Sequence, residues 1–266
     1  MKHILLLGTG GTIACKHGDS GLTPLLTGDE LLSYVPAARS FCEVEAIQVL
    51  NIDSTNIHPK HWQLLCHVLE ENYDNYDGFV ICHGTDTMAY TAAAMSYLVQ
   101  HSKKPIVITG AQKPIDLDVT DARTNLLDSL RFASCERAHG VNIVFDGKVI
   151  AGTRGKKERT KSYNAFSSIN FPYLAVIQDE HILFYIDDKW QDRENVRFYH
   201  DLDDRVALLK LIPSMESSIL DYMGEHYDAV VIESFGVGGL PSYESGDFYH
   251  SIEKMTQAGK IVVMTT

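Results

Sequence analysis

The sequence lacks the cysteine spacings that hold small secreted domains or zinc-binding domains together. Five cysteines occur, at Cys15, Cys42, Cys66, Cys82 and Cys135. Their number is odd and none of them forms a C-x-x-C pair, so we expect neither a disulfide framework nor a zinc site. Buried free thiols are the simpler interpretation.

Long apolar runs are also missing. The run ILLL at residues 4–7 is too short for a signal peptide, and no other apolar stretch reaches the length of roughly 20 residues that crosses a membrane. We therefore expect a cytoplasmic protein without a membrane partner. The sequence has no low-complexity tract, and 45% of its 266 residues are hydrophobic, which is typical of a folded chain.

Positive charge is scarce, since 23 Lys and Arg stand against 35 Asp and Glu and the formal net charge is -12. This balance argues against a nucleic-acid partner or an anionic membrane surface, because both bind through an excess of Lys and Arg. We interpret the basic stretch RGKKERTK (154–161) as a solvated face, because aromatic residues are not interleaved through it. A small solute is the expected partner.

Short apolar runs bounded by Gly, Pro or Asp alternate with segments of helical period. This pattern predicts an α/β fold with a mostly parallel sheet and flanking helices. Strands are predicted at 4–7, 45–50, 78–82, 105–110 and 141–147, and helices at 59–72, 87–100 and 121–134. The stretch TGDE (27–30) has the pattern of a capping box at the start of a short helix.

The charged segment 185–205 shows neither period and predicts a domain boundary. We expect a large N-terminal α/β domain at 1–186, a linker at 187–205 and a smaller α/β domain at 206–266. Helices in the small domain are predicted around 215–224 and 248–257. No helix follows the last predicted strand to cover its face, so we expect the second domain to be truncated.

The first predicted strand ends in a glycine-rich stretch, GTGGTIA. A dinucleotide-binding fingerprint would need glycine where Ile13 stands. A phosphate-binding P-loop would need lysine after Gly11, where the sequence has Thr12. Both alternatives fit poorly, and a purely structural glycine turn stays open as an interpretation.

The same arrangement recurs later, where the apolar strand GFVIC leads into HGTDTMAYTA at 83–92. The carboxyl ends of neighbouring parallel strands share one crevice, so Thr12 and the Thr85–Asp86 pair are expected to face the same bound molecule. As an alternative, Asp86 and Thr87 cap the following helix.

Three histidines, one pair and one single residue, have structural interpretations. His58 and His61 lie one turn apart at the start of a predicted helix, but no third ligand is evident, so we predict no metal site there or elsewhere. His83 precedes the glycine of the second motif and is expected to brace that turn by hydrogen bonding.

Together, TGGTIA (9–14) and HGTDTMAYTA (83–92) resemble the signatures of the bacterial-type asparaginase and glutaminase family. The similarity covers nearly the whole chain and continues through NIDSTNI (51–57), KPIVITGAQ (104–112), TDARTNLLDSLRFA (120–133), GTRGKKERTKSYNAF (152–166) and VVIESFGVGGLP (230–241). Within the family, the chain most resembles the cytoplasmic type I branch. The resemblance implies an L-asparagine amidohydrolase that needs no cofactor and works as a homodimer or homotetramer.

The resemblance also implies residue roles. Thr12 would be the nucleophile that attacks the side-chain amide carbon, and a neighbour must take its proton because a threonine hydroxyl is a weak nucleophile. Lys157 and Asp86 would hold the hydroxyl of Thr85 and polarise an attacking group or water. The oxyanion would be bound by backbone N–H groups at Gly11 and Gly84. The implied substrate-binding residues are Asp53, Ser54, Thr55, Thr85 and Asp86. Taken alone, the DST stretch is an ordinary turn.

Three departures from the family pattern motivate alternatives. Leu22 stands where relatives carry a loop tyrosine, and Gly239 and Leu240 stand where many periplasmic relatives carry asparagines. An acid that relatives supply from a neighbouring protomer would lie beyond Thr266. One alternative is therefore a catalytically weak or inactive asparagine-binding or sensor protein. Another is the amidase subunit of a tRNA-dependent amidotransferase, which the start MKHILLL, directly on the first strand, disfavours.

Overall fold

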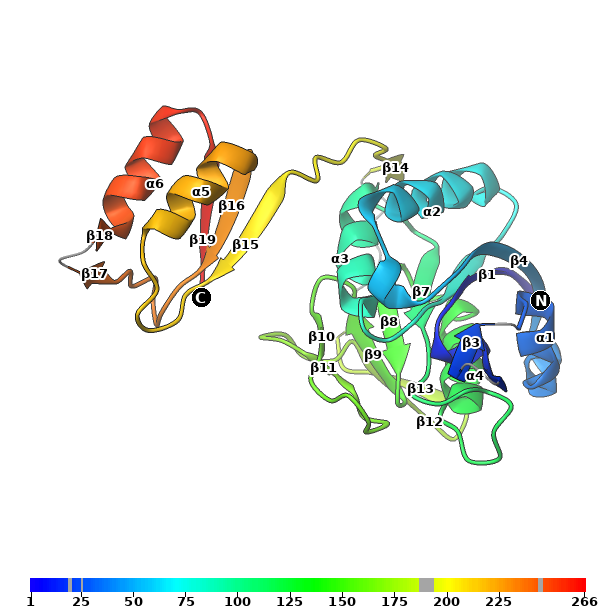
Figure 1. Cartoon of the computed structure of the whole chain (residues 1–266). Coiled ribbons are helices and arrows are strands. Elements are labelled where there is room, and N and C mark those ends of the chain that lie inside the picture. Colours follow the sequence, from blue (N-terminus) through cyan, green and yellow to red (C-terminus); the bar gives the residue numbers. More distant parts are fainter. Residues whose placement is uncertain (19–20, 25, 187–193, 244–245) are drawn as a thin grey trace. The chain divides into compact units, whose positions relative to one another are not determined.

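The chain divides into two units, Met1–Asp201 and Leu202–Thr266, in the computed structural model (Figure 1). The structure describes residues 1–18, 21–24, 26–186, 194–243 and 246–266, without the side chains of 16–25 and 246. Among the helices in these ranges, none combines the length and the apolar character needed to cross a membrane. The two units are described separately below.

The large unit is built on an eight-stranded sheet with the order β13-β12-β9-β8-β7-β5-β1-β4. Its strands are β1 Lys2–Gly10, β4 Cys42–Ile52, β5 Gly78–Cys82, β7 Pro105–Thr109, β8 Gly140–Phe145, β9 Lys148–Ala151, β12 Ala175–Gln178 and β13 His181–Phe184. The strands from β4 to β8 along this order pair in parallel, which confirms the predicted sheet.

The sheet continues beyond β8 with three antiparallel strands that sequence analysis did not predict: β9, β12 and β13. Each of them is four residues long, which leaves too few residues for a readable period. The β12–β13 turn uses Asp179 and Glu180 with φ of 47° and 70°, a left-handed conformation that short polar residues adopt more readily than apolar ones.

Four helices in the described part of the large unit flank the sheet. They are α1 Gly28–Ser33, α2 Pro59–Asn72, α3 Met88–Leu98 and α4 Ala122–Ala133. The predicted capping box of α1 is confirmed, because the Thr27 side chain accepts from the N–H of Glu30 and the Glu30 carboxylate accepts from the N–H of Thr27. At the start of α2, the rings of His58 and His61 play the same two roles, which explains this histidine pair structurally.

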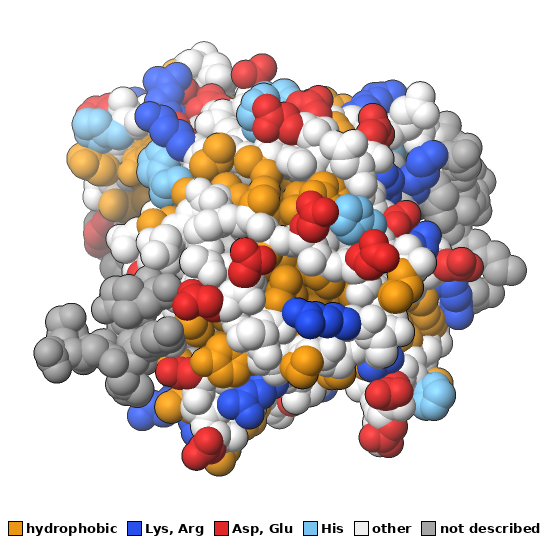
Figure 2. Space-filling model, turned by 90° about the vertical axis from the view of Figure 1, so that its right-hand side faces the viewer, with side chains coloured by type: hydrophobic (Ala, Val, Ile, Leu, Met, Phe, Trp, Pro, Cys, Tyr) orange, Lys and Arg blue, Asp and Glu red, His pale blue; other side chains and the backbone are white. Residues whose placement is uncertain are grey.

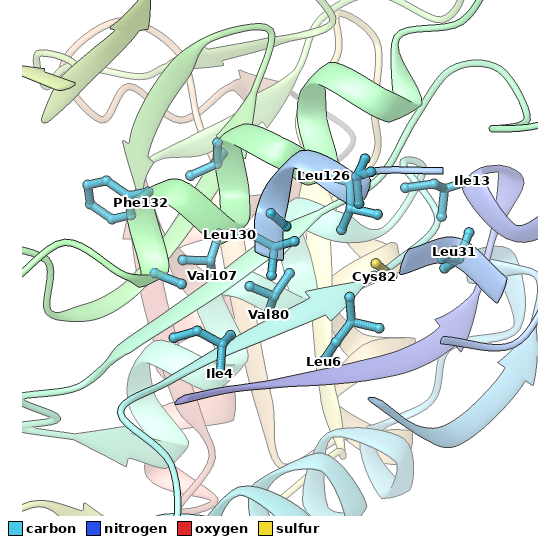
Figure 3. Packing of buried hydrophobic residues seen from close by; sticks show 14 of the residues in the cluster. Ile4, Leu6, Ile13, Leu31, Val80, Cys82, Val107, Leu126, Leu130 and Phe132 are labelled. Atoms are coloured by element: carbon cyan, nitrogen blue, oxygen red, sulfur yellow. The ribbon is translucent and has the colours of Figure 1, made fainter. Parts of the chain in front are cut away.

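One face of the parallel sheet packs against α4. Ile4 and Leu6 of β1, Val80 of β5 and Val107 of β7 are fully buried there together with Leu130 (Figure 3). Full burial of each such aliphatic side chain stabilises the fold by about 1.5–3 kcal/mol. The apolar runs found in the sequence thus form the core that fixes the strand ends.

Shorter elements complete the large unit. They are the 3-10 helices Thr12–Ala14, Pro36–Ser40 and Ser54–Asn56, the hairpin of β2 Cys15–Gly18 and β3 Gly21–Pro24, and the hairpin of β10 Gly155–Lys157 and β11 Phe166–Ser168. The predicted helix 87–100 ends at Leu98, because Val99–Gln100 forms β6 and pairs with β14, Arg197–Phe198. β14 falls inside the segment predicted as a linker, and residues 187–193 of that segment lie outside the described residues.

The small unit is a three-stranded parallel sheet, β15 Val206–Lys210, β16 Ala229–Glu233 and β19 Ile261–Thr265, with helices α5 Ser218–His226 and α6 Phe248–Gln257. The short strands β17 Ser242–Tyr243 and β18 Gly246–Asp247 precede α6. The first helix begins three residues later than predicted, at Ser218. One face of the sheet packs on Leu220, Phe248 and Met255, whereas the other exposes Val206, Leu208, Ile261 and Val263.

Charge is mixed over the surface of the large unit. On the face shown in Figure 2, acidic and basic side chains are interspersed and hydrophobic atoms lie in recesses between them.

Candidate active site

The glycine turn after β1 contacts the turn after β5. A Cβ atom built on Gly11 would lie 2.4 Å from the Cα of Gly84, and one built on Gly84 would lie 2.6 Å from the Oγ of Ser54. Real Cβ atoms do not approach other atoms so closely, so only glycine lets these three loops meet. Gly10 and Gly11 also have φ of 99° and 75°, which residues with a side chain rarely adopt.

Two threonines flank this contact between the turns. Thr12 follows Gly11 and begins a 3-10 helix with a half-buried side chain. Thr85 follows Gly84 and is 5% exposed. The Gly11–Gly84 contact therefore brings the first and second motifs together, as predicted from the shared end of neighbouring parallel strands.

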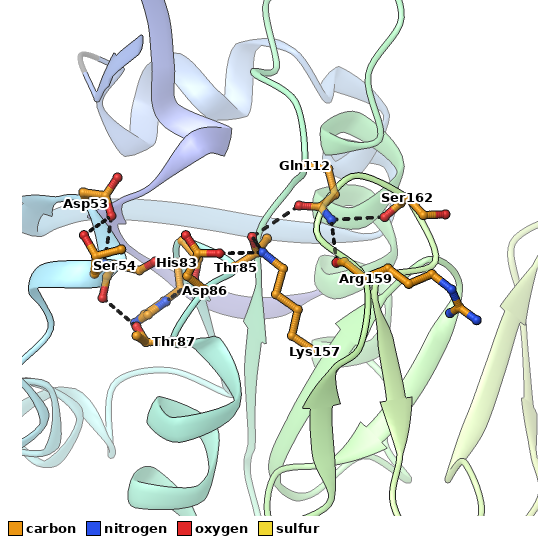
Figure 4. Close-up of polar contacts among 12 residues, drawn as sticks. Asp53, Ser54, His83, Thr85, Asp86, Thr87, Gln112, Lys157, Arg159 and Ser162 are labelled. Carbon is orange, nitrogen blue, oxygen red and sulfur yellow. Dashed lines mark hydrogen bonds and ion pairs between the residues drawn. The ribbon is translucent and has the colours of Figure 1, made fainter. Parts of the chain in front are cut away.

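Thr85, Asp86 and Lys157 form a hydrogen-bonded group (Figure 4). The Nζ of Lys157 donates to the Oγ1 of Thr85 and to the Oδ1 of Asp86, both at 2.7 Å. The Lys157 side chain is 14% exposed, whereas the Asp86 side chain is 57% exposed. The partly buried ammonium is thus paired with a carboxylate that opens to solvent, and it polarises a buried hydroxyl.

The helix-cap alternative for this motif does not fit the structure. Thr87 occupies the N-cap of α3 but makes no side-chain capping bond, and its hydroxyl donates to the carbonyl of Ser54 at 2.7 Å. Asp86 pairs with Lys157. The polar residues of the second motif therefore bind neighbouring loops.

Gln112 orients the hydroxyl of Thr85 from the other side. The Thr85 hydroxyl accepts from Lys157, and its own hydrogen is directed to the Oε1 of Gln112 at 3.3 Å. The amide nitrogen of Gln112 donates to the carbonyls of Arg159 and Ser162, which fixes which end of the amide faces Thr85. The hydroxyl therefore has one defined donor and one defined acceptor (Figure 4).

A buried carboxylate supports the loop that carries Gln112. Asp121 is 7% exposed and accepts from the backbone N–H groups of Gln112 and Lys113 and from the side chain of Asn125. Burial raises the pKa of Asp121, and these hydrogen bonds oppose the shift because they favour the charged form. Asp121 thus fixes a turn at the end of β7.

Asp53, Ser54 and Thr55 form a turn after β4. The Asp53 carboxylate accepts from the N–H of Thr55 at 2.8 Å and from its hydroxyl at 2.7 Å, and these bonds lower the pKa of Asp53. Ser54 is 4% exposed and packs on Gly84, while Thr55 is exposed. The geometry is that of an Asx turn next to the second motif, and the substrate-binding role of this segment stays a prediction.

His83 braces the second motif, as predicted. Its Nδ1 lies 2.7 Å from the carbonyl of Gly84, which only accepts, so Nδ1 carries the proton. Its Nε2 then accepts from the Thr91 hydroxyl at 2.9 Å, and Thr91 in turn accepts from the indole N–H of Trp62 at 2.9 Å. Complete burial lowers the pKa of His83 to about 4, so the ring is neutral at pH 7.

A pocket of about 560 Å³ opens beside the ion pair of Lys157 and Asp86. Its walls come from α3, from the segment that ends in β10 and from the residue after β11: Ala89, Tyr90, Ala93, Thr153, Arg154, Gly155, Lys156 and Ile169. A pocket of this volume accommodates a small solute. Thr12 and Asp53 do not line it, so the pocket lies on the Lys157 side of the predicted site.

Two of the noted departures can be located. Leu22 lies in β3 opposite His17 of β2, and its side chain is outside the described residues. Gly239 lies in a turn of the small unit, where it pairs with Phe235.

Sequence analysis assigned no role to Gln112, Thr91 or Trp62. Gln112 follows β7 through the stretch ITGAQ, so a polar residue comes after glycine at a third strand end, and this signal was available in the sequence. The bond between Trp62 and Thr91 joins α2 to α3, and nothing in the local sequence of either helix predicts it.

Comparisons with known proteins match the chain along its length. The family model "Asparaginase, N-terminal" matches residues 3–190, and the model "Glutaminase/Asparaginase C-terminal domain" matches residues 205–266. The L-asparaginase of Thermococcus kodakarensis is 35% identical over 264 residues, covering 99% of this chain and 79% of that protein. A glutamyl-tRNA(Gln) amidotransferase subunit of Pyrococcus abyssi is 33% identical over 279 residues, covering 100% of this chain but 63% of that protein.

Solved structures show the same architecture. The thermostable L-asparaginase from Thermococcus kodakarensis has a TM-score of 0.92 at 33% identity, over 99% of this chain and 80% of that one. L-asparaginase I from Vibrio cholerae has a TM-score of 0.86 at 29% identity, over 98% of this chain and 80% of that one.

Proposed function

The chain belongs to the glutaminase/asparaginase family, and from this premise we propose that it hydrolyses L-asparagine to L-aspartate and ammonia through a threonine acyl-enzyme. The observation that carries the proposal is the pair of threonine-bearing turns in contact at Gly11 and Gly84, with Lys157 hydrogen bonded to Thr85 and Asp86. Nucleophilic catalysis by a hydroxyl needs a polarising partner within hydrogen-bond distance of the reacting groups.

The proposed reaction has two steps. The Oγ1 of Thr12 bonds to the side-chain amide carbon of asparagine, and the amide nitrogen leaves as ammonia with the hydroxyl proton. Water then adds to the ester carbon, aspartate is released and one water proton returns to the Oγ1 of Thr12. Lys157 and Thr85 orient the attacking water, and backbone N–H groups at Gly11 and Gly84 bind the oxyanion of each tetrahedral intermediate.

Substrate recognition is proposed for the turns after β4 and β5. An α-amino acid needs an anion beside its ammonium and neutral donors beside its carboxylate. Asp86, whose side chain is half exposed, provides the anion. Thr55 is exposed and provides a neutral hydroxyl, and the contact of its neighbour Ser54 with Gly84 holds this turn against the second motif. Discrimination between asparagine and glutamine rests on one methylene, which pocket shape resolves by only about 1–3 kcal/mol.

Ammonia release from asparagine and glutamine tests the proposal. We expect turnover of asparagine by the full chain and its loss in Thr12→Ala. Thr256→Ala is the matched control, because it makes the same change at an exposed threonine of α6. Mass spectrometry of the quenched reaction should find an aspartyl adduct on the peptide that contains Thr12. Unchanged turnover in Thr12→Ala, or an adduct elsewhere, would contradict the mechanism.

Two alternatives are distinguished by the ammonia assay together with calorimetry. An asparagine sensor would bind asparagine in calorimetry without releasing ammonia. An amidotransferase component, an alternative with which the identity of 33% to the Pyrococcus abyssi protein is consistent, would release ammonia only together with a partner protein and charged tRNA. The proposed homodimer or homotetramer is tested separately by light scattering of the purified chain.

A further inference from the structure

Three potential metal ligands gather at the far end of α2 from its histidine cap. His67 and Glu70 lie one turn apart on α2, and His200 follows β14. Each offers one ligand atom, and these atoms all lie within 4.8 Å of one another. We call this group, His67, Glu70 and His200, the histidine cluster. It is separate from the residues of the proposed active site.

Contacts inside the histidine cluster are close. The Nε2 of His200 lies 2.7 Å from the Oε2 of Glu70, and the rings of His67 and His200 meet edge to face with centroids 6.0 Å apart. A second carboxylate adjoins the group, because the Oε1 of Glu71 lies 3.1 Å from the Nε2 of His67. Two imidazoles and two carboxylates thus share one patch of surface.

The backbone around His200 is held against α2 by two bonds and against the end of α3 by a third. Gln63 donates to the carbonyl of His200 at 2.8 Å, and the thiol of Cys66 donates to the carbonyl of Tyr199 at 3.4 Å. The N–H of Tyr199 donates to the carbonyl of Leu98 at 2.8 Å. Because α2 supplies two of these anchors and two of the ligands, the backbone that carries the third ligand is positioned before any ion binds. Such preorganisation lowers the entropic cost of assembling a site.

We propose that the histidine cluster binds one divalent transition-metal ion of the zinc class. Imidazole together with carboxylate suits Zn²⁺ and its neighbours, whereas Mg²⁺ and Ca²⁺ prefer oxygen ligands alone. Bonds of about 2.0–2.2 Å place the ligand atoms of a tetrahedral site roughly 3.3 Å apart. The present spacings run from 2.7 Å between His200 and Glu70 to no more than 4.8 Å, so side-chain rotation has to widen the shortest of them and shorten the longest. The three side chains are 44–59% exposed, which leaves an open path and a fourth position for water.

This proposal departs from the expectation that the chain has no metal site. Sequence analysis considered His58 and His61, which cap α2, and missed the cluster because His200 is 130 residues from Glu70 in the sequence. A bound ion would tie α2 to His200, next to Asp201, the last residue of the large unit. We expect the ion to stabilise the attachment of β14 without taking part in amide hydrolysis.

Calorimetric titration of the chelator-treated full chain with zinc chloride tests the site. We expect one ion per chain, a dissociation constant raised roughly tenfold or more in His200→Asn and in Glu70→Gln, and a zinc-dependent rise in melting temperature that both variants lose. Titration with Co²⁺ should add a visible absorption band of tetrahedral type in the unmodified chain and in neither of these two variants. These readouts do not depend on enzymatic activity.

His101→Asn is the matched control. His101 also faces a carboxylate, Glu194, at 3.2 Å, and its φ of 56° is one that asparagine tolerates. We expect this variant to bind zinc as the unmodified chain does. The proposal would be overturned if zinc did not bind stoichiometrically, or if it bound His200→Asn and Glu70→Gln as tightly as the unmodified chain. The cluster would then be an ordinary surface ion pair. Circular dichroism of each variant at the same temperature verifies that it is folded.

Discussion

Removal of the imidazole of His83 should change how stability depends on pH. His83 is 1% exposed, and burial lowers its pKa from 6.5 to about 4. The unfolded chain therefore takes up a proton at this residue as the pH falls through the window between 6.5 and 4, while the folded chain does not. Stability from this residue is complete above pH 6.5 and is lost progressively below it.

The magnitude follows from the difference between the two pKa values. Each tenfold change in proton affinity is worth about 1.4 kcal/mol, so the folded chain should lose about 3 kcal/mol of unfolding free energy across this window. The loss has a structural cause, because a protonated Nε2 can no longer accept from Thr91. The hydrogen-bonded chain from Trp62 to Gly84 would then be broken at its centre.

Urea unfolding of the unmodified chain and of His83→Gln, followed by tryptophan fluorescence at several pH values from 4 to 8, measures this effect. We expect the stability advantage of the unmodified chain over the variant to shrink by about 3 kcal/mol between pH 7 and pH 4. Groups common to both proteins cancel in this difference. His250→Gln, an exposed change on α6, should keep the pH profile of the unmodified chain. Parallel profiles for the unmodified chain and His83→Gln would refute the reasoning.

Three further predictions concern single side chains. Lys157→Met removes the donor shared by Thr85 and Asp86 and should lower ammonia release by about 100-fold or more. Lys161→Met is the control, because Lys161 is exposed. Near-normal turnover in Lys157→Met would contradict the role of Lys157. Gly84→Ala places a methyl group 2.6 Å from the Oγ of Ser54 and should lower the free energy of unfolding in urea by about 1–3 kcal/mol. An unchanged unfolding midpoint would contradict this prediction and show that the loops move apart to accommodate the methyl group. Asp128→Asn should stabilise the chain by about 1–2 kcal/mol at pH 8 and not at pH 4. Burial raises the Asp128 pKa to about 6, so the charged carboxylate destabilises the folded chain at pH 8, and the partial exposure of the side chain reduces the size of this effect. Higher stability of the unmodified chain than of the variant at pH 8 would contradict this sign.

The parallel part of the fold and two of the site's turns could be predicted from the sequence. Strands such as 78–82 are continuous apolar runs because they are buried on both faces, and the glycines that end them mark where the chain turns. The rule that parallel strands end at a common edge then brought Thr12 and Thr85 together. These inferences rest on local pattern and on one topological rule.

Lys157 could not be placed in the same way. It is 71 residues from Asp86, on a three-residue strand of a hairpin whose position depends on tertiary packing. Its local sequence is a basic stretch that resembles a solvated face, and only the family resemblance distinguished it from its neighbours. His200 was missed for a related reason, because its partners come from a distant segment and no period or spacing records such contacts. Gln112 does follow a glycine at a strand end, but its contact with Thr85 joins residues from two different strand ends.

The glycines after β1 answer the question that the first motif poses. A phosphate loop keeps its glycines so that backbone N–H groups surround an anion, whereas here the nearest atoms to a Cβ on Gly11 belong to the backbone of Gly84. The N–H of Gly11 is also bonded to the carbonyl of Ile52 at 3.1 Å. The N–H of Gly11 must therefore break its bond to Ile52 before it can bind the oxyanion. For this reason we expect the N–H groups on the Thr12 side of the turn to contribute more to the proposed oxyanion binding than the N–H of Gly11.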